Sequence, residues 1–160
     1  MNYQPNAKLR TCLWFERDGA QAADYYVSLL PDSRIETKID PQADQPAIQV
    51  IEFRLAGAPF MILNTGVRFE PTPATSIAVL TDDQAETDRL WDTLIGDGGS
   101  EQMCGWLTDR YGVSWQLTPR ALPRLFSAPD RAAASRAHAA MLQMKRIDIA
   151  AIERAFRGES

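Results

Sequence analysis

The stretch CGWLTDRYGVSWQ, residues 104–116, contains two β-prone runs on either side of a polar turn. Residues 105–108 and 113–118 fit short strands, because Trp, Val and Thr favour extended backbone. The turn between them, residues 109–112, begins with Asp and ends with Gly, which are residues that tight turns favour. The sequence therefore predicts a β-hairpin at this point of the chain.

A strand and a helix are expected before this hairpin. Residues 75–80 fit the strand, and Thr81 with Gln84 three residues later matches the capping-box pattern of a helix start. Apolar residues at helical spacing then follow, namely Leu90, Trp91, Leu94 and Ile95. Glycines at 96, 98 and 99 end the helix. Residues 100–104 are compatible with one more short strand.

The first half of the chain repeats this order. Strands are expected at residues 8–15, 34–40, 47–56 and 60–63, a helix from Asp18 onward, and a polar loop at residues 41–46. A shift of 65 residues lays Asp18 on Asp83 and Tyr26 on Trp91. The alternative is chance agreement between two α+β stretches. We favour a duplicated strand–helix–strand–strand–strand (βαβββ) module in an α+β fold.

A change of composition follows Pro119. Residues 121–126 fit a short helical turn, the alanine-rich residues 131–144 a longer helix, and residues from Asp148 onward a last helix. We expect one domain over residues 1–160, with modules at 9–66 and 73–120 and a helical tail at 121–158. These amphipathic helices need a surface to cover, either their own sheet or a second subunit.

Composition excludes several classes of protein. The net charge of −4 gives no electrostatic reason to expect nucleic acid or an anionic membrane as a partner. The sequence shows neither an apolar run long enough for a membrane span nor a signal peptide. Two cysteines, Cys12 and Cys104, are too few for a disulfide scaffold, and we expect reduced thiols in a soluble, cytoplasmic protein.

Several strings resemble the PhnB-like branch of the vicinal-oxygen-chelate superfamily, which includes the glyoxalases and bleomycin-resistance proteins. They are residues 60–64 (FMILN), 76–79 (SIAV), 90–91 (LW), 98–99 (GG), 104–116 and the tail from residue 140 to 150. The resemblance covers roughly residues 9–157, and residues 104–116 are its most specific part. It implies tandem βαβββ modules, each curling an open sheet around a cleft, in a homodimer.

Members of this branch often carry the label 3-demethylubiquinone 3-methyltransferase. A methyl donor is usually held by a glycine-rich turn between a strand and a following helix. The tight glycine cluster here, residues 96–99, follows a helix instead, which is typical of a helix end. We therefore regard the methyltransferase activity as unsupported by the sequence.

Metal-dependent relatives hold divalent ions through His, Glu or Gln on the first and last strand of each module. The resemblance carries those positions over to Thr11, Met61, Ser76 and Gln116. A thioether and two hydroxyls are poor ligands for Zn, Ni, Mn or Fe, and Gln116 alone is not a site. The lone histidine, His138, is expected on the surface of the tail. We predict no metal and no cofactor.

The expected cleft combines aromatic walls with a few hydrogen-bonding groups, which suits a small organic ligand. The predicted ligand-binding residues are Thr11, Trp14, Phe60, Asn64, Ser76, Trp106, Trp115 and Gln116. For each aromatic residue, packing in a module core is the alternative. Cys104, beside Gly105, is the candidate nucleophile, with a buried structural thiol as the alternative. Glu52 and Glu70 show no carboxylate partner.

Three functions remain open at this point. The first is a metal-free protein that binds a small organic molecule as a homodimer. The second is an enzyme of the glyoxalase/dioxygenase superfamily that uses groups such as Cys104 and Gln116, or a metal completed by a partner subunit. The third is a scaffold that works by dimerisation. The weak metal-ligand set favours the first and third, and the aromatic lining favours the first.

Overall fold

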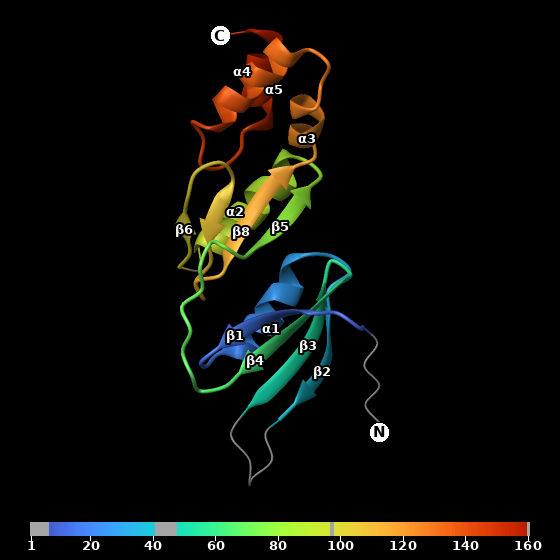
Figure 1. Ribbon diagram of the computed structural model, residues 1–160, viewed down its shortest axis with the longest axis vertical. Coiled ribbons are helices and arrows are strands. Elements are labelled where there is room, and N and C mark those ends of the chain that lie inside the picture. Colours follow the sequence, from blue (N-terminus) through green and yellow to red (C-terminus); the bar gives the residue numbers. More distant parts are fainter. Residues whose placement is uncertain (1–6, 41–47, 97, 160) are drawn as a thin grey trace. The chain divides into compact units, whose positions relative to one another are not determined.

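A computed structural model describes residues 7–40, 48–96 and 98–159, so the loop expected at residues 41–46 lies outside the described residues. The chain forms two compact units, which we call unit 1 (Met1–Glu70) and unit 2 (Pro71–Ser160). Each unit has its own four-stranded sheet (Figure 1). No helix in the described ranges is long and apolar enough to cross a membrane.

Unit 1 is a βαβββ module. Its elements are β1 (Thr11–Phe15), α1 (Gly19–Leu29), β2 (Arg34–Ile39), β3 (Gln49–Leu55) and β4 (Ala58–Asn64). The strand order is β1-β4-β3-β2, with β1 parallel to β4 and the other pairs antiparallel. The parallel pair is possible because α1 and two further strands connect β1 to β4.

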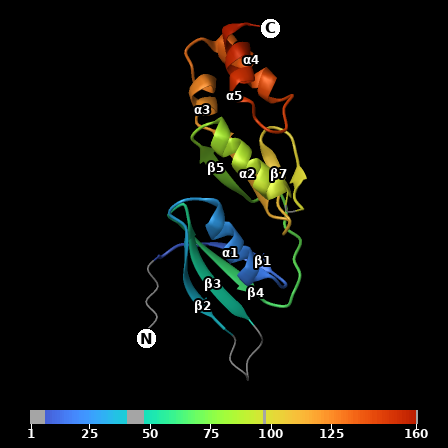
Figure 2. The same cartoon turned by 180° about the vertical axis from the view of Figure 1, so that it is seen from behind.

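The core of unit 1 lies between its sheet and α1. Side chains alternate between the two faces of a strand, so one face collects Leu13, Phe15, Ile51, Phe53 and Ile62, all buried. The helix α1 packs on this face (Figure 2). Its residues Ala22, Tyr26 and Leu29 are buried. The opposite face, which we call the outer face of sheet 1, carries the remaining side chains of the four strands.

Unit 2 repeats the module and then continues. Its elements are β5 (Ser76–Thr81), α2 (Gln84–Gly96), β6 (Ser100–Glu101), β7 (Trp106–Thr108) and β8 (Ser114–Pro119), with the strand order β5-β8-β7-β6. Leu90, Trp91 and Leu94 of α2 pack on one face, and the opposite one is the outer face of sheet 2. The predicted α+β fold with duplicated βαβββ modules is confirmed.

The cap of α2 differs from the one that the sequence predicts. Thr81 is the last residue of β5, and its hydroxyl lies 2.6 Å from that of Thr87, buried between strand and helix. Asp83 caps the helix instead, because its Oδ1 accepts the backbone N–H of Glu86 at 2.8 Å. The extended backbone of the strand keeps Thr81 out of the cap position.

Three helices follow the second module, as the composition predicts. They are α3 (Ala121–Phe126), α4 (Arg131–Met141) and α5 (Ile149–Arg157). They share a small apolar core of Leu122, Ala137, Ile147 and Ile152. Asp130 and Asp148 cap α4 and α5 by accepting the backbone N–H groups of Ala133 and Ala151. The helices therefore cover each other.

The segment between α4 and α5 fastens this tail to the hairpin of residues 104–116. The N–H groups of Cys104 and Gly105 donate to the carbonyls of Met144 and Lys145, both at 2.7 Å. Gly105 has φ +80, and a Cβ there would lie 2.6 Å from the carbonyl oxygen of Leu117. This position therefore requires glycine, because any side chain would push the tail and β8 apart.

Candidate functional site

The outer face of sheet 2 brings three of the predicted ligand-binding residues together. Gln116 of β8 pairs with Trp106 of β7, and its Nε2 donates to Ser76 Oγ of β5 at 2.8 Å. Leu80, on the same face by strand alternation, is 51% exposed. An amide, a hydroxyl, an indole and an exposed aliphatic side chain thus share one surface.

Trp115, also predicted to bind a ligand, lies on the other face of the same sheet, away from Ser76, Trp106 and Gln116. The ring is fully buried in register with Ile77 and Leu107, among the residues that face α2. Its indole N–H donates to Asp109 Oδ2 at 2.9 Å. Because neighbouring strand residues point to opposite faces, Gln116 and Trp115 cannot line the same surface.

In sheet 1, too, the residues predicted to bind a ligand are divided between the two faces of the sheet. Trp14 lies on the outer face, is 39% exposed, and donates from Nε1 to the carbonyl of Val67 at 2.8 Å. Thr11, Phe60 and Asn64 belong to the face that packs on α1. Phe60 stacks on Phe53 in the core, and Asn64 lies under the first residue of α1, Gly19.

A buried charge network, which the sequence analysis missed, occupies the outer face of sheet 1. Glu36 accepts from Arg10 at 2.6 Å and from Arg54 at 2.8 Å, and Glu52 lies 3.4 Å from Arg10. The side chains of Arg10 and Glu36 are only 6% and 8% exposed. Arg34, at the exposed side of the network, lies 3.7 Å from Glu36 and 3.6 Å from Asp32. With this pair included, three guanidinium groups and three carboxylates balance each other.

Two carboxylates that the sequence left without partners are paired in the structure. Glu52 belongs to the buried network, and Glu70 pairs with Arg68 at 2.7 Å on the surface. A signal for the network is present in β3, where Glu52 and Arg54 alternate with the buried Ile51 and Phe53. The partners of Arg10, Glu36 and Glu52, lie 26 and 42 residues away from it in the sequence, so spacing alone does not identify them.

The positions that hold a divalent metal in related folds do not form a suitable donor set. Met61, Ser76 and Gln116 lie on outer faces, but Thr11 lies on the helix side of its sheet, and Cys12 takes the place beside Met61. A thioether, a thiol, a hydroxyl and an amide do not suit a hard or borderline divalent ion. Within the described ranges, no three His, Cys, Asp or Glu side chains cluster to hold a metal.

The two cysteines have different environments. Burial raises the pKa of Cys12, an effect opposed by a hydrogen bond with the backbone of Leu63. Cys12 is therefore held as the neutral thiol near neutral pH, which is a weak nucleophile. Cys104 has a left-handed backbone with φ 61, and its N–H is committed to the tail. Cys104 thus has a structural backbone role, and its chemical reactivity stays a prediction.

The glycine cluster at the end of α2 is a helix terminus. Gly96 is the last helical residue, and the N–H groups of Gly98 and Gly99 donate to the carbonyl of Ile95. Gly98 has φ +99, as residues that follow a helix often do. These N–H groups are used within the turn, so this cluster does not supply the strand-to-helix phosphate or methyl-donor loop of nucleotide-binding folds.

Comparisons with known proteins agree with this architecture. The family model described as 3-demethylubiquinone-9 3-methyltransferase matches residues 7–118. The solved PhnB protein of Bacillus cereus is 32% identical, with a TM-score of 0.65, and the match covers 71% of this chain and 99% of that chain. No curated protein matches.

Two more distant structures share the fold. A Pseudomonas aeruginosa protein is 23% identical with a TM-score of 0.59, and the match covers 71% of this chain and 98% of that chain. The fosfomycin resistance protein FosX of Mesorhizobium loti is 14% identical with a TM-score of 0.52, over 72% of this chain and 92% of that one. At these identities the likeness concerns the fold alone.

Proposed function

The chain belongs to the family described as 3-demethylubiquinone-9 3-methyltransferase, and we propose that within it this protein binds a small organic molecule on its outer sheet faces, without a metal and as a homodimer. The observation that carries the proposal is the surface formed by Ser76, Trp106 and Gln116 beside the exposed Leu80. Small-molecule sites typically combine such apolar area with few polar groups.

The charge balance of sheet 1 favours an uncharged ligand. Arg10, Glu36, Glu52 and Arg54 form ion pairs with one another, so the outer face of sheet 1 presents Trp14 and apolar strand residues to a ligand. Displacing one member of the network to bind an ion would leave a buried charge without its partner, which is costly. A neutral, partly aromatic or aliphatic molecule fits this surface better.

The homodimer is supported by the exposed apolar surface and the sheet edges. Each unit exposes large apolar side chains: Trp14, 39% exposed, in unit 1, and Leu80 and Met103, 51% and 46% exposed, in unit 2. Exposed apolar side chains of this kind can mark interaction surfaces. The order of the strands places β1 and β2 at the edges of one sheet and β5 and β6 at the edges of the other. Edge strands can pair with another chain.

The methyltransferase activity in the family description is not part of the proposal. A methyl donor would need a glycine turn that precedes a helix, whereas the glycine turn of this protein follows α2. In addition, the neutral thiol of Cys12 is a weak nucleophile. An enzyme that works through Cys104 and Gln116 therefore remains the second hypothesis of the sequence analysis, without a structural observation that favours it.

The binding proposal can be tested with Nile red, a neutral dye that fluoresces in apolar sites. We expect a saturable fluorescence increase with the native protein, and at least a five-fold weaker affinity in Trp106→Ala and Gln116→Ala. Gln143→Ala removes an exposed amide far along the tail and is the matched control. Unchanged affinity in both outer-face variants would contradict the proposal.

The other two parts of the proposal have direct measurements. Light scattering coupled to gel filtration should give twice the mass of one chain, and a monomer would contradict the dimer. Elemental mass spectrometry on untagged protein should find far less than one Zn, Mn, Fe or Ni per chain. A stoichiometric metal would favour the enzyme hypothesis.

A further inference from the structure

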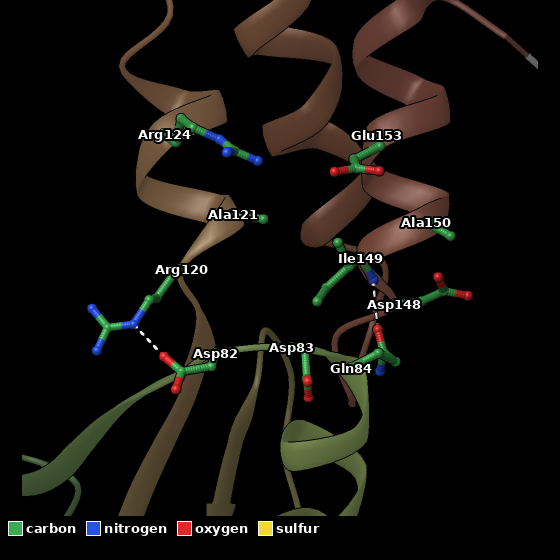
Figure 3. Close-up of a pocket in the computed structure, with 10 residues that line it drawn as sticks. All are labelled: Asp82, Asp83, Gln84, Arg120, Ala121, Arg124, Asp148, Ile149, Ala150 and Glu153. Carbon is green, nitrogen blue, oxygen red and sulfur yellow. Dashed lines mark hydrogen bonds and ion pairs between the residues drawn. The ribbon is translucent and has the colours of Figure 1, made fainter.

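Unit 2 contains a pocket of about 490 Å³ that is separate from the outer sheet faces. It lies where the first turns of α2 and α5 meet α3 (Figure 3). Seven of its ten lining residues follow residue 118, so they lie beyond the part of the chain that the family model matches. None of the residues predicted from the sequence to bind a ligand lines it. The volume is in the range of small-molecule sites.

Three of the carboxylates at this pocket are already used by the fold. Asp82 forms an ion pair with Arg120. Asp83 Oδ1 accepts the N–H of Glu86 at 2.8 Å and caps α2, and Asp148 Oδ1 accepts the N–H of Ala151 at 2.9 Å and caps α5. These groups hold the walls of the pocket in place.

Gln84 joins two of the walls. Its Nε2 donates to the carbonyl of Ile147 at 2.9 Å, and its Oε1 accepts the N–H of Ile149 at 2.9 Å. The Nε2 also donates to Asp88 at 2.9 Å. Both ends of the Gln84 amide are thus satisfied, and they attach α2 to the start of α5.

Two charged groups of opposite sign remain. Arg124 of α3 and Glu153 of α5 extend toward each other from opposite walls (Figure 3). Neither forms an ion pair or a hydrogen bond with another side chain in the part of the protein that the structure describes. Between them the lining is apolar, with Ala121 and Ile149, and below these lie Asp82, Asp83 and Gln84 (Figure 3). Apart from the ion pair and the two helix caps, the pocket therefore presents one cation, Arg124, and one anion, Glu153, with apolar side chains between them.

We propose that this pocket binds a small zwitterion of the α-amino-acid type with an apolar side chain. Its carboxylate would lie at the guanidinium of Arg124, which can form two parallel hydrogen bonds with it. Its ammonium would lie at Glu153, and its side chain over Ala121 and Ile149. A molecule with one charge satisfies only one of the two groups, so the pairing of charges provides the selectivity.

The test is a titration of the ¹⁵N-labelled full chain, followed by the chemical shifts of its backbone amides. The probes are L-leucine and L-phenylalanine, with N-acetyl-L-leucine as the anion alone and L-leucinamide as the cation alone. We expect both amino acids to shift amides of α3 and α5 in a saturable way. Each singly charged probe should bind at least ten-fold more weakly than leucine.

Variants assign the effect to the two charges. Arg124→Gln and Glu153→Gln should each weaken leucine binding at least ten-fold while the melting temperature stays within a few degrees. Arg154→Gln, at the neighbouring exposed position of α5, is the control and should bind leucine normally. Trp106→Ala should also bind leucine normally, which separates this site from the outer face of sheet 2.

Three results would overturn the proposal. One is the absence of saturable shifts with both amino acids. Another is equal binding of leucine, N-acetyl-leucine and leucinamide. The third is a fall in melting temperature in both Arg124→Gln and Glu153→Gln without a change in leucine binding, which would show that the two residues stabilise the fold and do not bind the ligand.

Discussion

Units 1 and 2 share one strand order but bury their polar groups differently. In unit 1, Arg10, Glu36, Glu52 and Arg54 form a network on the outer face of the sheet. In unit 2, Asp109 alone accepts three N–H groups, from Tyr111, Val113 and the indole of Trp115. A repeated backbone topology therefore does not determine how the two copies satisfy buried polar atoms.

The two sets of polar contacts also differ in how far apart their partners lie in the sequence. Arg10 and Glu36 are 26 residues apart, whereas the partners of Asp109 are two to six residues away. The unit 1 network can form only after β1, β2 and β3 have come together. The Asp109 bonds close a single hairpin turn, so they form locally.

The strongest test of this comparison removes the centre of the unit 1 network. Glu36→Ala leaves the buried guanidinium of Arg10 and the partly buried guanidinium of Arg54 without their shared carboxylate. Breaking a buried pair by removing one partner typically costs about 3–5 kcal/mol. We expect a loss of that size in the free energy of unfolding. Hydrogen-exchange mass spectrometry should place the lost protection in β2, β3 and β4 and leave the hairpin of unit 2 protected.

The control for this variant is Asp24→Ala, which removes an exposed pair with Lys38 and should cost less than about 1 kcal/mol. Equal losses in the two variants would mean that the network contributes no more than a surface ion pair. Loss of protection in both units would show that the units do not respond separately.

The matching change in unit 2 is Asp109→Ala. It leaves the N–H groups of Tyr111 and Val113 and the indole of Trp115 without an acceptor, and we expect a loss of about 2–4 kcal/mol. Urea denaturation followed by tryptophan fluorescence measures it. Asp82→Ala, an exposed partner of Arg120, is the control. A loss below about 1 kcal/mol would contradict the role that we assign to Asp109.

A smaller effect, on the pH dependence of a cysteine's reactivity, is expected at the outer face of sheet 1. Because burial raises the pKa of Cys12, its thiolate fraction near neutral pH is below that of an ordinary cysteine. Alkylation of Cys12 by iodoacetamide, followed by peptide mapping, should therefore rise with pH at higher values in the folded protein than in urea. Identical pH profiles in the two states would contradict this environment for Cys12.

The smallest effect that we expect is on the pKa of Glu101, which forms an ion pair with Lys145 of the tail in unit 2. Hydrogen bonds from Lys145, and secondarily from Trp91, lower the pKa of Glu101. Its folded-state value lies below its unfolded value, so the stabilisation is present at neutral pH and is lost as the pH falls through the folded-state value. An NMR titration of the Glu101 carboxyl should show the low pKa, and Lys145→Ala should raise it. An unchanged value in Lys145→Ala would mean that this contact is not maintained in solution.

Much of the fold follows from the sequence pattern. The alternation of Ile51 and Phe53 with Glu52 and Arg54 predicts β3, and the apolar stripe with Trp91 predicts α2. The candidate site is less predictable. Of the eight expected ligand-binding residues, four lie on outer faces, namely Trp14, Ser76, Trp106 and Gln116, and the other four lie on the helix side of their sheets. The face is hard to predict because a shift of one residue moves a side chain to the other side of its sheet.

By itself, the sequence determines the duplicated βαβββ order, the helical tail and the family, because periodicity and turn residues act within short stretches of chain. Only the tertiary structure decides which of two faces a strand residue occupies, the pairing of Arg10 with Glu36, and the placement of Arg124 and Glu153 on opposite walls of one pocket. Contacts of this kind join residues that lie far apart in the chain, and their partners are selected by packing and register.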